Sequence, residues 1–163
     1  MRCFIAVDLP GEIRDYLYRF QNNLKKLPAK IRWVEKKNLH LTIKFLGDIN
    51  DDLLKKIKES LAKIKFNNFK SNLSEIGFFP NENRINVIWV GIAPSNKVIE
   101  LQQKIDSELL NLFPQDQRFS SHVTLGRVKF VKNKNDFIKI LKEQKIEKLS
   151  FVIEAPQSYV NAL

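Results

Sequence analysis

Hydrophobic residues along this chain fall either into short runs or at helical spacing. Runs rich in β-branched and aromatic residues, closed by Pro or Gly, predict strands or extended pieces. Apolar residues three or four positions apart predict helices with one buried face. We expect extended segments at residues 2–8, 31–34, 39–46, 69–79, 84–92, 122–130 and 149–153. We expect helices at residues 12–26, 51–64, 95–112 and 134–144.

The order of these elements repeats along the chain. Each half runs strand, Pro-marked turn, helix, histidine-containing strand and helix, and the segments FIAVDLP and VIWVGIAP both end in Pro. Helices and strands alternate, but hairpin-like strand neighbours also occur, which favours an α+β fold over a doubly wound sheet. We expect one domain over residues 1–163, with two similar lobes over roughly residues 1–81 and 82–163.

Composition narrows the class of partner. Of the 163 residues, 44% are hydrophobic, which is enough for a core at this length. Lys and Arg number 28 against 18 Asp and Glu, which gives a net charge of +10. This excess favours a polyanionic partner such as nucleic acid, an anionic membrane surface or a phosphorylated substrate. A Lys-rich surface that serves solubility or heat adaptation explains the same charge equally well.

The single cysteine, Cys3, lies in an apolar run, so neither an intrachain disulfide nor a cysteine metal site can form. A reducing compartment fits this usage. No segment is long enough to span a membrane, and the first ten residues are too short and too charged for a signal peptide. We therefore expect a cytoplasmic protein, and a monomer because nothing resembles a coiled-coil or dimer helix.

Two copies of one short motif carry the candidate chemistry. The only two histidines, His40 and His122, are each followed two positions later by one of the only two threonines, Thr42 and Thr124. With the threonines fixed, random placement of two histidines gives this match with a probability of about 10⁻⁴. Residues two apart in a strand point to one face, so each strand presents an imidazole beside a hydroxyl. The alternate positions would face a core: Leu41, Ile43, Phe45, Val123 and Leu125.

Such a pair of strands, related by an approximate two-fold, suits phosphodiester chemistry. Histidine titrates near neutrality, so one imidazole can deprotonate water while the other protonates the leaving oxygen. The threonine hydroxyls can donate to the non-bridging oxygens. A base and an acid placed in line need no metal, and two histidines without a nearby Asp, Glu or Cys pattern make a poor metal set. We expect neither a metal nor another cofactor.

Two cations near the motifs are further candidates. Arg127 could clamp the phosphate. Strict alternation places it opposite His122, so this role requires a twist or a bulge near Gly126. Lys44 shares the parity of His40, but ordinary surface charge explains it better. A lone strand histidine more often packs than catalyses, and the second copy of the motif is what argues against that alternative here.

Aromatic side chains could stack on a base, although most aromatic residues in apolar runs belong to the core. The candidates are Trp33, Phe45, Phe78, Phe79 and Trp89. We expect one or two of them beside the cleft.

At these residues the sequence resembles the 2H phosphoesterase superfamily, and more narrowly the RNA 2′,3′-cyclic phosphodiesterases, once described as 2′-5′ RNA ligases. The resemblance covers most of the chain. It rests on the segments MRCFIAVDLP, IRWVEKKNLHLTIKFLGD, IGFFPNENRINVIWVGI and FSSHVTLGRVK.

The resemblance implies a bilobal α+β fold, with two pseudo-symmetric lobes of antiparallel sheet flanked by helices around a central cleft. It implies metal-independent hydrolysis of a terminal RNA 2′,3′-cyclic phosphate to a 2′-phosphate. By motif, His40 and His122 would be the acid and base, and Thr42 and Thr124 would contact the phosphate. Arg127 sits where members with an extended second motif carry a phosphate-contacting Arg.

Two features depart from the family pattern. Ser120 and Ser121 precede the second histidine where relatives tend to have a proline. The C-terminal segment FVIEAPQSYVNAL looks shorter than the family's final strand region, and a missing closing strand could expose an edge or widen the cleft.

Three other functions stay open from the sequence. The chain could join RNA ends through a 2′-5′ linkage, or bind RNA without turnover. It could also act on another superfamily substrate, such as a cyclic ADP-ribose phosphate or an oligoadenylate.

Overall fold

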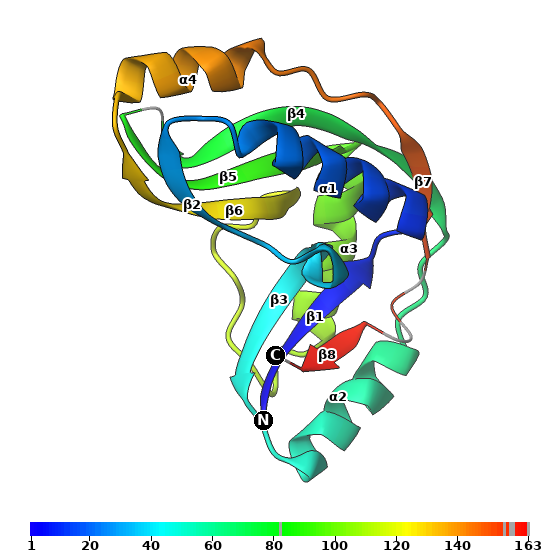
Figure 1. Cartoon of the computed structure of the whole chain (residues 1–163). Coiled ribbons are helices and arrows are strands. Elements are labelled where there is room, and N and C mark those ends of the chain that lie inside the picture. Colours follow the sequence, from blue (N-terminus) through cyan, green and yellow to red (C-terminus); the bar gives the residue numbers. More distant parts are fainter. Residues whose placement is uncertain (82, 155, 157–158, 163) are drawn as a thin grey trace.

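A computed structural model describes residues 1–81, 83–154, 156 and 159–162 of the chain (Figure 1). The strands are β1 (Arg2–Asp8), β2 (Ala29–Trp33), β3 (His40–Asp48), β4 (Phe69–Asn81), β5 (Arg84–Ala93), β6 (His122–Val131), β7 (Ser150–Ile153) and β8 (Val160–Ala162). The helices are α1 (Gly11–Leu24), α2 (Asp51–Ala62), α3 (Ser95–Glu108) and α4 (Lys134–Glu143), with a 3₁₀ turn η1 (Lys36–Asn38). The expected α+β class is confirmed.

Two of the helices begin at capping residues that the sequence supplies. The Asn50 side chain accepts a hydrogen bond from the Leu53 amide at 2.9 Å and so caps α2. Asn133 caps α4 in the same way through the Asp136 amide, at 3.2 Å. Each cap satisfies an amide that the first turn of a helix leaves without a partner. Both helices then bury one face, with Ile57 on α2 among the fully buried residues.

The strands form one curled antiparallel sheet in the order β7-β4-β5-β6-β3-β1-β8, and β2 also pairs with β6. Strand β6 therefore has two neighbours along one edge. It meets β3 at a single pair, Leu41 with Val123, and meets β2 from Gly126 to Val131. Figure 1 shows β3 and β6 spreading apart from this junction.

The two halves of the chain exchange strands. Strand β2, from the first half, pairs with β6, while β8, from the end of the chain, pairs with β1. The expected division into lobes over residues 1–81 and 82–163 stays a prediction, and residue 82 lies outside the described residues.

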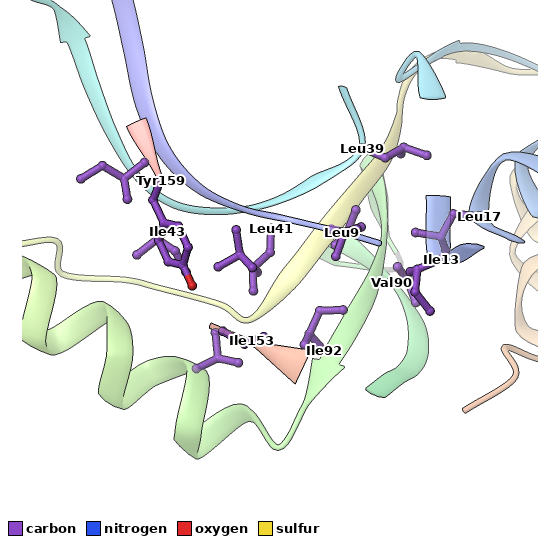
Figure 2. Close-up of a cluster of buried hydrophobic side chains, with 14 of the residues drawn as sticks. Leu9, Ile13, Leu17, Leu39, Leu41, Ile43, Val90, Ile92, Ile153 and Tyr159 are labelled. Atoms are coloured by element: carbon purple, nitrogen blue, oxygen red, sulfur yellow. The ribbon is translucent and has the colours of Figure 1, made fainter. Parts of the chain in front are cut away.

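Helices α1 and α3 pack against one face of the sheet and bury the core there. Figure 2 shows part of this cluster, which includes side chains from α1, β3 and β5. The labelled side chains from these elements are Ile13, Leu17, Leu41, Ile43, Val90 and Ile92. All six are at most 2% exposed. The opposite face of the sheet is left free of these helices.

The structure corrects two expectations near the chain's later elements. Helix α3 ends at Glu108 rather than near residue 112, and the next residues continue in turns such as the 2.8 Å bond from the Leu112 amide to the Leu109 carbonyl. The closing strand is not missing, because β8 pairs with β1. Three residues are too few for a recognisable strand pattern. Residues 155, 157, 158 and 163 of that segment lie outside the described residues.

Candidate active site

The two His-x-Thr motifs lie beside each other in the sheet, because Leu41 of β3 pairs with Val123 of β6. The strands are antiparallel, so the residue before Leu41 is opposite the residue after Val123, and the reverse. Each histidine is therefore opposite the threonine of the other motif, and the two histidines lie on a diagonal. Leu41 and Val123 are fully buried in the core, as alternation predicts.

A cleft of about 680 Å³ lies over this junction, on the face opposite the core. All five residues predicted from the sequence line it: His40, Thr42, His122, Thr124 and Arg127. The motif side chains are half-buried. Imidazole nitrogens and hydroxyl oxygens are therefore gathered around one space large enough for a nucleotide-sized ligand.

A β-bulge follows each motif. The ladder to β1 skips Ile43, the residue directly after the first motif. The ladder to β5 skips Leu125, which has the same place after the second. A bulge shifts the alternation of side chains by one residue. Consequently the residues five positions after the histidines, Phe45 and Arg127, turn back towards the cleft and line it.

These bulges decide two expectations. Arg127 lies on the cleft face because a bulge directly before Gly126 shifts the alternation. Strict alternation places Arg127 opposite His122, so its role at the phosphate required such a bulge. The expectation that Phe45 faces the core is wrong, since its side chain is 68% exposed. The extra residue Ile43 changes the phase of β3, and a bulge is not visible in a hydrophobic pattern of this length.

Aromatic rings contact both imidazoles. Phe4 stacks on His40 with ring centroids 4.6 Å apart. Phe79 meets His122 edge-on at 4.8 Å, and Trp89 lies at 5.9 Å from it. Of the five predicted aromatic candidates, Phe45 and Phe79 line the cleft, in line with the expected one or two. Phe4 was missed because it stands in an apolar run, and only its pairing with Phe45 on β3 reveals its side of the sheet.

A backbone hydrogen bond sets the tautomer of His122. The Nδ1 atom of His122 lies 2.8 Å from the carbonyl oxygen of Ser120. A carbonyl only accepts, so Nδ1 donates, and in the neutral ring Nε2 is left unprotonated. The His122 imidazole thus keeps Nε2 available for proton transfer. His40 also forms a backbone hydrogen bond, with Asn38 two residues earlier, and this bond raises its pKa.

Burial lowers the pKa of both histidines below the ordinary 6.5. For His40, the Asn38 bond and Asp8 oppose this shift, while Arg14 adds to it. For His122, the Ser120 bond opposes the shift and the charge of Arg127 adds to it. Both rings therefore favour the neutral form, and a bound phosphate would favour the protonated one by charge attraction.

Lys44 is a buried cation with carboxylate partners, so the expectation of an ordinary surface charge is wrong. Its Nζ donates to Asp106 Oδ1 at 2.6 Å and to the Pro114 carbonyl at 3.0 Å, and lies 3.2 Å from Asp116 Oδ1. The Lys44 side chain is only 2% exposed. Its ammonium group thereby holds Pro114 and Asp116 at the start of a loop. Residues Asp116–Ser120 of this loop line one wall of the cleft. Sequence parity alone could not reveal carboxylate partners more than 60 positions away.

The part of the chain that the structure describes contains neither a metal-binding cluster nor a membrane-spanning helix. No group of three or more His, Cys, Asp or Glu side chains there is placed to hold a metal ion. Among the described helices, none has the length and apolar character needed to cross a membrane.

The curled sheet with paired His-x-Thr strands defines a phosphoesterase of the 2H class. The family profile described as LigT like phosphoesterase matches residues 7–89. The chain belongs to this family.

Its relatives include named enzymes. A Methanocaldococcus jannaschii protein named RNA 2′,3′-cyclic phosphodiesterase is 42% identical, over 82% of this chain and 75% of its own. A protein of the same name from Methanothermobacter thermautotrophicus is 32% identical, over 88% and 79%. Among solved structures, Escherichia coli LigT complexed with 3′-AMP superposes with a TM-score of 0.71 at 25% identity, covering 93% of this chain and 83% of that one.

Proposed function

We propose that this protein hydrolyses RNA 2′,3′-cyclic phosphate ends to 2′-phosphates by metal-independent acid/base catalysis with His40 and His122. The pairing of Leu41 with Val123 carries the proposal, because it gathers both imidazoles and both hydroxyls at one cleft. The names of the relatives supply the substrate class.

The two histidines divide the proton transfers between them. A neutral imidazole accepts a proton from water through Nε2 as the water oxygen bonds to phosphorus. The bond from phosphorus to the 3′ oxygen breaks, and the protonated imidazole on the other side gives that oxygen its proton. The product is a 2′-phosphate with a free 3′ hydroxyl, and the two histidines exchange protonation states. The diagonal placement of the rings suits attack and departure on opposite sides of the phosphorus.

Three side chains bind the phosphate in this scheme. The Thr42 and Thr124 hydroxyls donate to the non-bridging oxygens, where negative charge increases in the transition state. The Arg127 guanidinium adds charge-assisted hydrogen bonds to the same group. The substrate is therefore held from both strands of the junction.

We also propose that the protein works as a cytoplasmic monomer. Its one cysteine, Cys3, is buried and free, which suits a reducing compartment. The site is assembled from β3 and β6 of one chain, so no second copy is needed to complete it.

Hydrolysis with a chelator present is the direct test. A 2′,3′-cyclic mononucleotide and a short RNA with the same end are incubated in EDTA across pH, and the phosphate products are identified by ³¹P NMR. We expect a 2′-phosphate from both and a bell-shaped rate. Adding an RNA with a 5′ hydroxyl end distinguishes hydrolysis from end joining, because ligation outrunning hydrolysis would reverse the assignment.

Variants of the two histidines test the mechanism. His40→Ala and His122→Ala should each abolish turnover while circular dichroism stays that of the wild type. Lys58→Ala on the exposed face of α2 is the matched control and should keep full activity. Near wild-type turnover in either histidine variant contradicts the acid/base scheme.

A further inference from the structure

Beyond the cleft, strands β2 and β6 continue as a strip of exposed side chains on the same face of the sheet. Arg32 of β2 pairs directly with Arg127 of β6, and Lys30 pairs with Phe130 two steps further along β2. All four side chains are exposed. We call Arg127, Arg32, Lys30 and Phe130 the β2–β6 strip.

The face on which Arg32 lies follows from Gly126. A Cβ added to Gly126 would meet Ile31 Cγ2 at 2.7 Å and the Trp33 ring at 2.9 Å. Ile31 and Trp33 therefore cover the core face of Gly126, and Arg32 between them points to the other face. That is the face to which Arg127, the neighbour of Gly126, turns when it lines the cleft.

A further bulge keeps Phe130 on this face. The ladder between β2 and β6 skips Lys129, so Phe130 pairs with Lys30 and shares its side of the sheet. Phe130 is 64% exposed, whereas Val128 and Val131 beside it pack against the core. An exposed phenyl ring thus lies beside cations at the outer end of the strip.

The opposed arginines lack a counter-charge from the protein. Like charges directly across a pair of strands destabilise the sheet. Neither Arg32 nor Arg127 has an acidic partner among the described residues, although seven ion pairs form elsewhere among them. An anion between the two guanidinium groups would remove the repulsion and accept hydrogen bonds from both.

We propose that the β2–β6 strip binds the single-stranded RNA segment directly 5′ of the cyclic phosphate, with its phosphates on Arg32 and Lys30 and an unpaired base on Phe130. Cations beside an exposed aromatic ring are the features that bind single strands without reading sequence. The strip is continuous with the cleft through Arg127, and the chain of a 3′-terminal cyclic phosphate leaves the site only in the 5′ direction. This inference rests on the proposed function and adds a preference for oligonucleotides over mononucleotides.

The test compares kcat/KM for a 2′,3′-cyclic mononucleotide with kcat/KM for single-stranded RNAs of increasing length that end in the same cyclic nucleotide. We expect the RNA to be the better substrate. Arg32→Ala and Phe130→Ala should each lower the ratio of RNA to mononucleotide kcat/KM by about tenfold. Arg32→Ala should also make the dependence of log kcat/KM for RNA on log salt shallower, by about 0.7. Lys58→Ala is the control and should keep the wild-type ratio.

Several outcomes would overturn RNA binding by the β2–β6 strip while leaving the proposed function intact. One is a wild-type ratio that does not rise with RNA length. A second is a loss in Arg32→Ala and Phe130→Ala that is equal for both substrates. A third is equal preference for an RNA whose upstream segment is paired in a duplex, because stacking on Phe130 needs an unpaired base. If neither substrate is hydrolysed, the proposed function fails. Fluorescence anisotropy of a labelled single-stranded RNA then tests RNA binding by the strip alone. Weaker binding by Arg32→Ala would support the strip, and unchanged binding would overturn it.

Discussion

Phe45 and Arg127 occupy matching positions on the two strands of the site. Each lies five residues after its histidine and beyond a bulge, and each pairs with a neighbouring strand, Phe45 with Phe4 and Arg127 with Val87. All four of these residues line the cleft. Equivalent backbone positions thus carry an aromatic ring on β3 and a cation on β6. From this asymmetry we propose that Phe45 stacks on the base from the β3 side, while Arg127 binds the phosphate from the β6 side together with the two threonines.

Removing the Arg127 guanidinium should lower kcat/KM for every substrate that carries the cyclic phosphate. A hydrogen bond to a charged group contributes about 1.5–3 kcal/mol, so Arg127→Ala should lower kcat/KM by about 10- to 100-fold. Arg127→Lys keeps the charge but not the planar fork, and should recover part of the loss. Steady-state kinetics on a cyclic mononucleotide measures both, with Arg84→Ala, an exposed arginine at the start of β5, as the control. Equal loss in Arg84→Ala would point to net charge rather than a contact.

Removing the exposed ring should act on binding of the base. Stacking on an aromatic side chain contributes about 1–3 kcal/mol per base, so Phe45→Ala should raise KM by about tenfold while kcat changes little. Phe45→Trp should restore KM, since any flat ring can stack. Kinetics on cyclic mononucleotides with a purine and with a pyrimidine measure the effect. A fall in kcat with unchanged KM would mean that Phe45 instead positions His40 through Phe4.

The lowered pKa of both histidines fixes where the rate is greatest. The base must be neutral, so kcat/KM falls below the lower apparent pKa, and the acid must be protonated, so it falls above the higher one. Burial lowers the pKa of both histidines below 6.5. The bell-shaped pH profile of kcat/KM should therefore have its maximum below pH 6.5. Arg127 adds to the lowering at His122, so Arg127→Ala should move one limb to higher pH. A bell centred above 6.5 in the wild type contradicts this.

The same shifts link folding to pH. A histidine whose pKa is lower in the folded state leaves the unfolded state with more bound protons just below pH 6.5. The free energy of unfolding is therefore highest above 6.5 and decreases as the pH falls towards the folded pKa. Urea midpoints on either side of 6.5 measure this, and the double variant His40→Gln/His122→Gln should show a flatter dependence. An equal slope in that variant would assign the effect to carboxylates.

Period-two and period-3.6 patterns predicted many of the elements here because those elements bury one face, and β1, which is buried from Cys3 to Val7, was predicted from its continuous apolar run. The patterns failed where the period is interrupted. The bulges at Ile43 and Leu125 each add one residue without changing the local composition. The predicted face of the sheet was therefore wrong for Phe45 and undecided for Arg127. β8 was missed because three residues do not establish a period.

The candidate site was more predictable than its surroundings. Two copies of His-x-Thr identify the reacting groups by composition and spacing alone, and both lie at the Leu41–Val123 junction. The partners of Lys44 depend on tertiary packing, since Asp106 is on α3 and Asp116 on a loop. Nothing in local sequence indicates which distant carboxylate a strand lysine will meet.

Gly77 provides the space that the Trp89 ring occupies beside His122. The two residues pair across β4 and β5, and a Cβ added to Gly77 would overlap the indole. Gly77→Ala should therefore displace Trp89, destabilise the fold by about 1–3 kcal/mol and lower kcat through His122. Gly11→Ala is the matched control, because no atom lies within 4 Å of its added Cβ. Urea denaturation and kinetics measure the two effects, and a Gly77→Ala protein as active and stable as Gly11→Ala would contradict the packing argument.

Lys44 should matter for stability more than any exposed lysine. Lys44→Met leaves the buried Asp106 carboxylate without its cation, and breaking a buried pair from one side costs about 3–5 kcal/mol. Lys56→Met on the exposed face of α2 should change the free energy of unfolding by less than about 0.5 kcal/mol. The double variant Lys44→Met/Asp106→Leu removes both charges and should recover much of the loss. Urea denaturation measures all three, and a Lys44→Met protein within about 1 kcal/mol of wild type would mean that Asp106 and Asp116 are stabilised without the ammonium group.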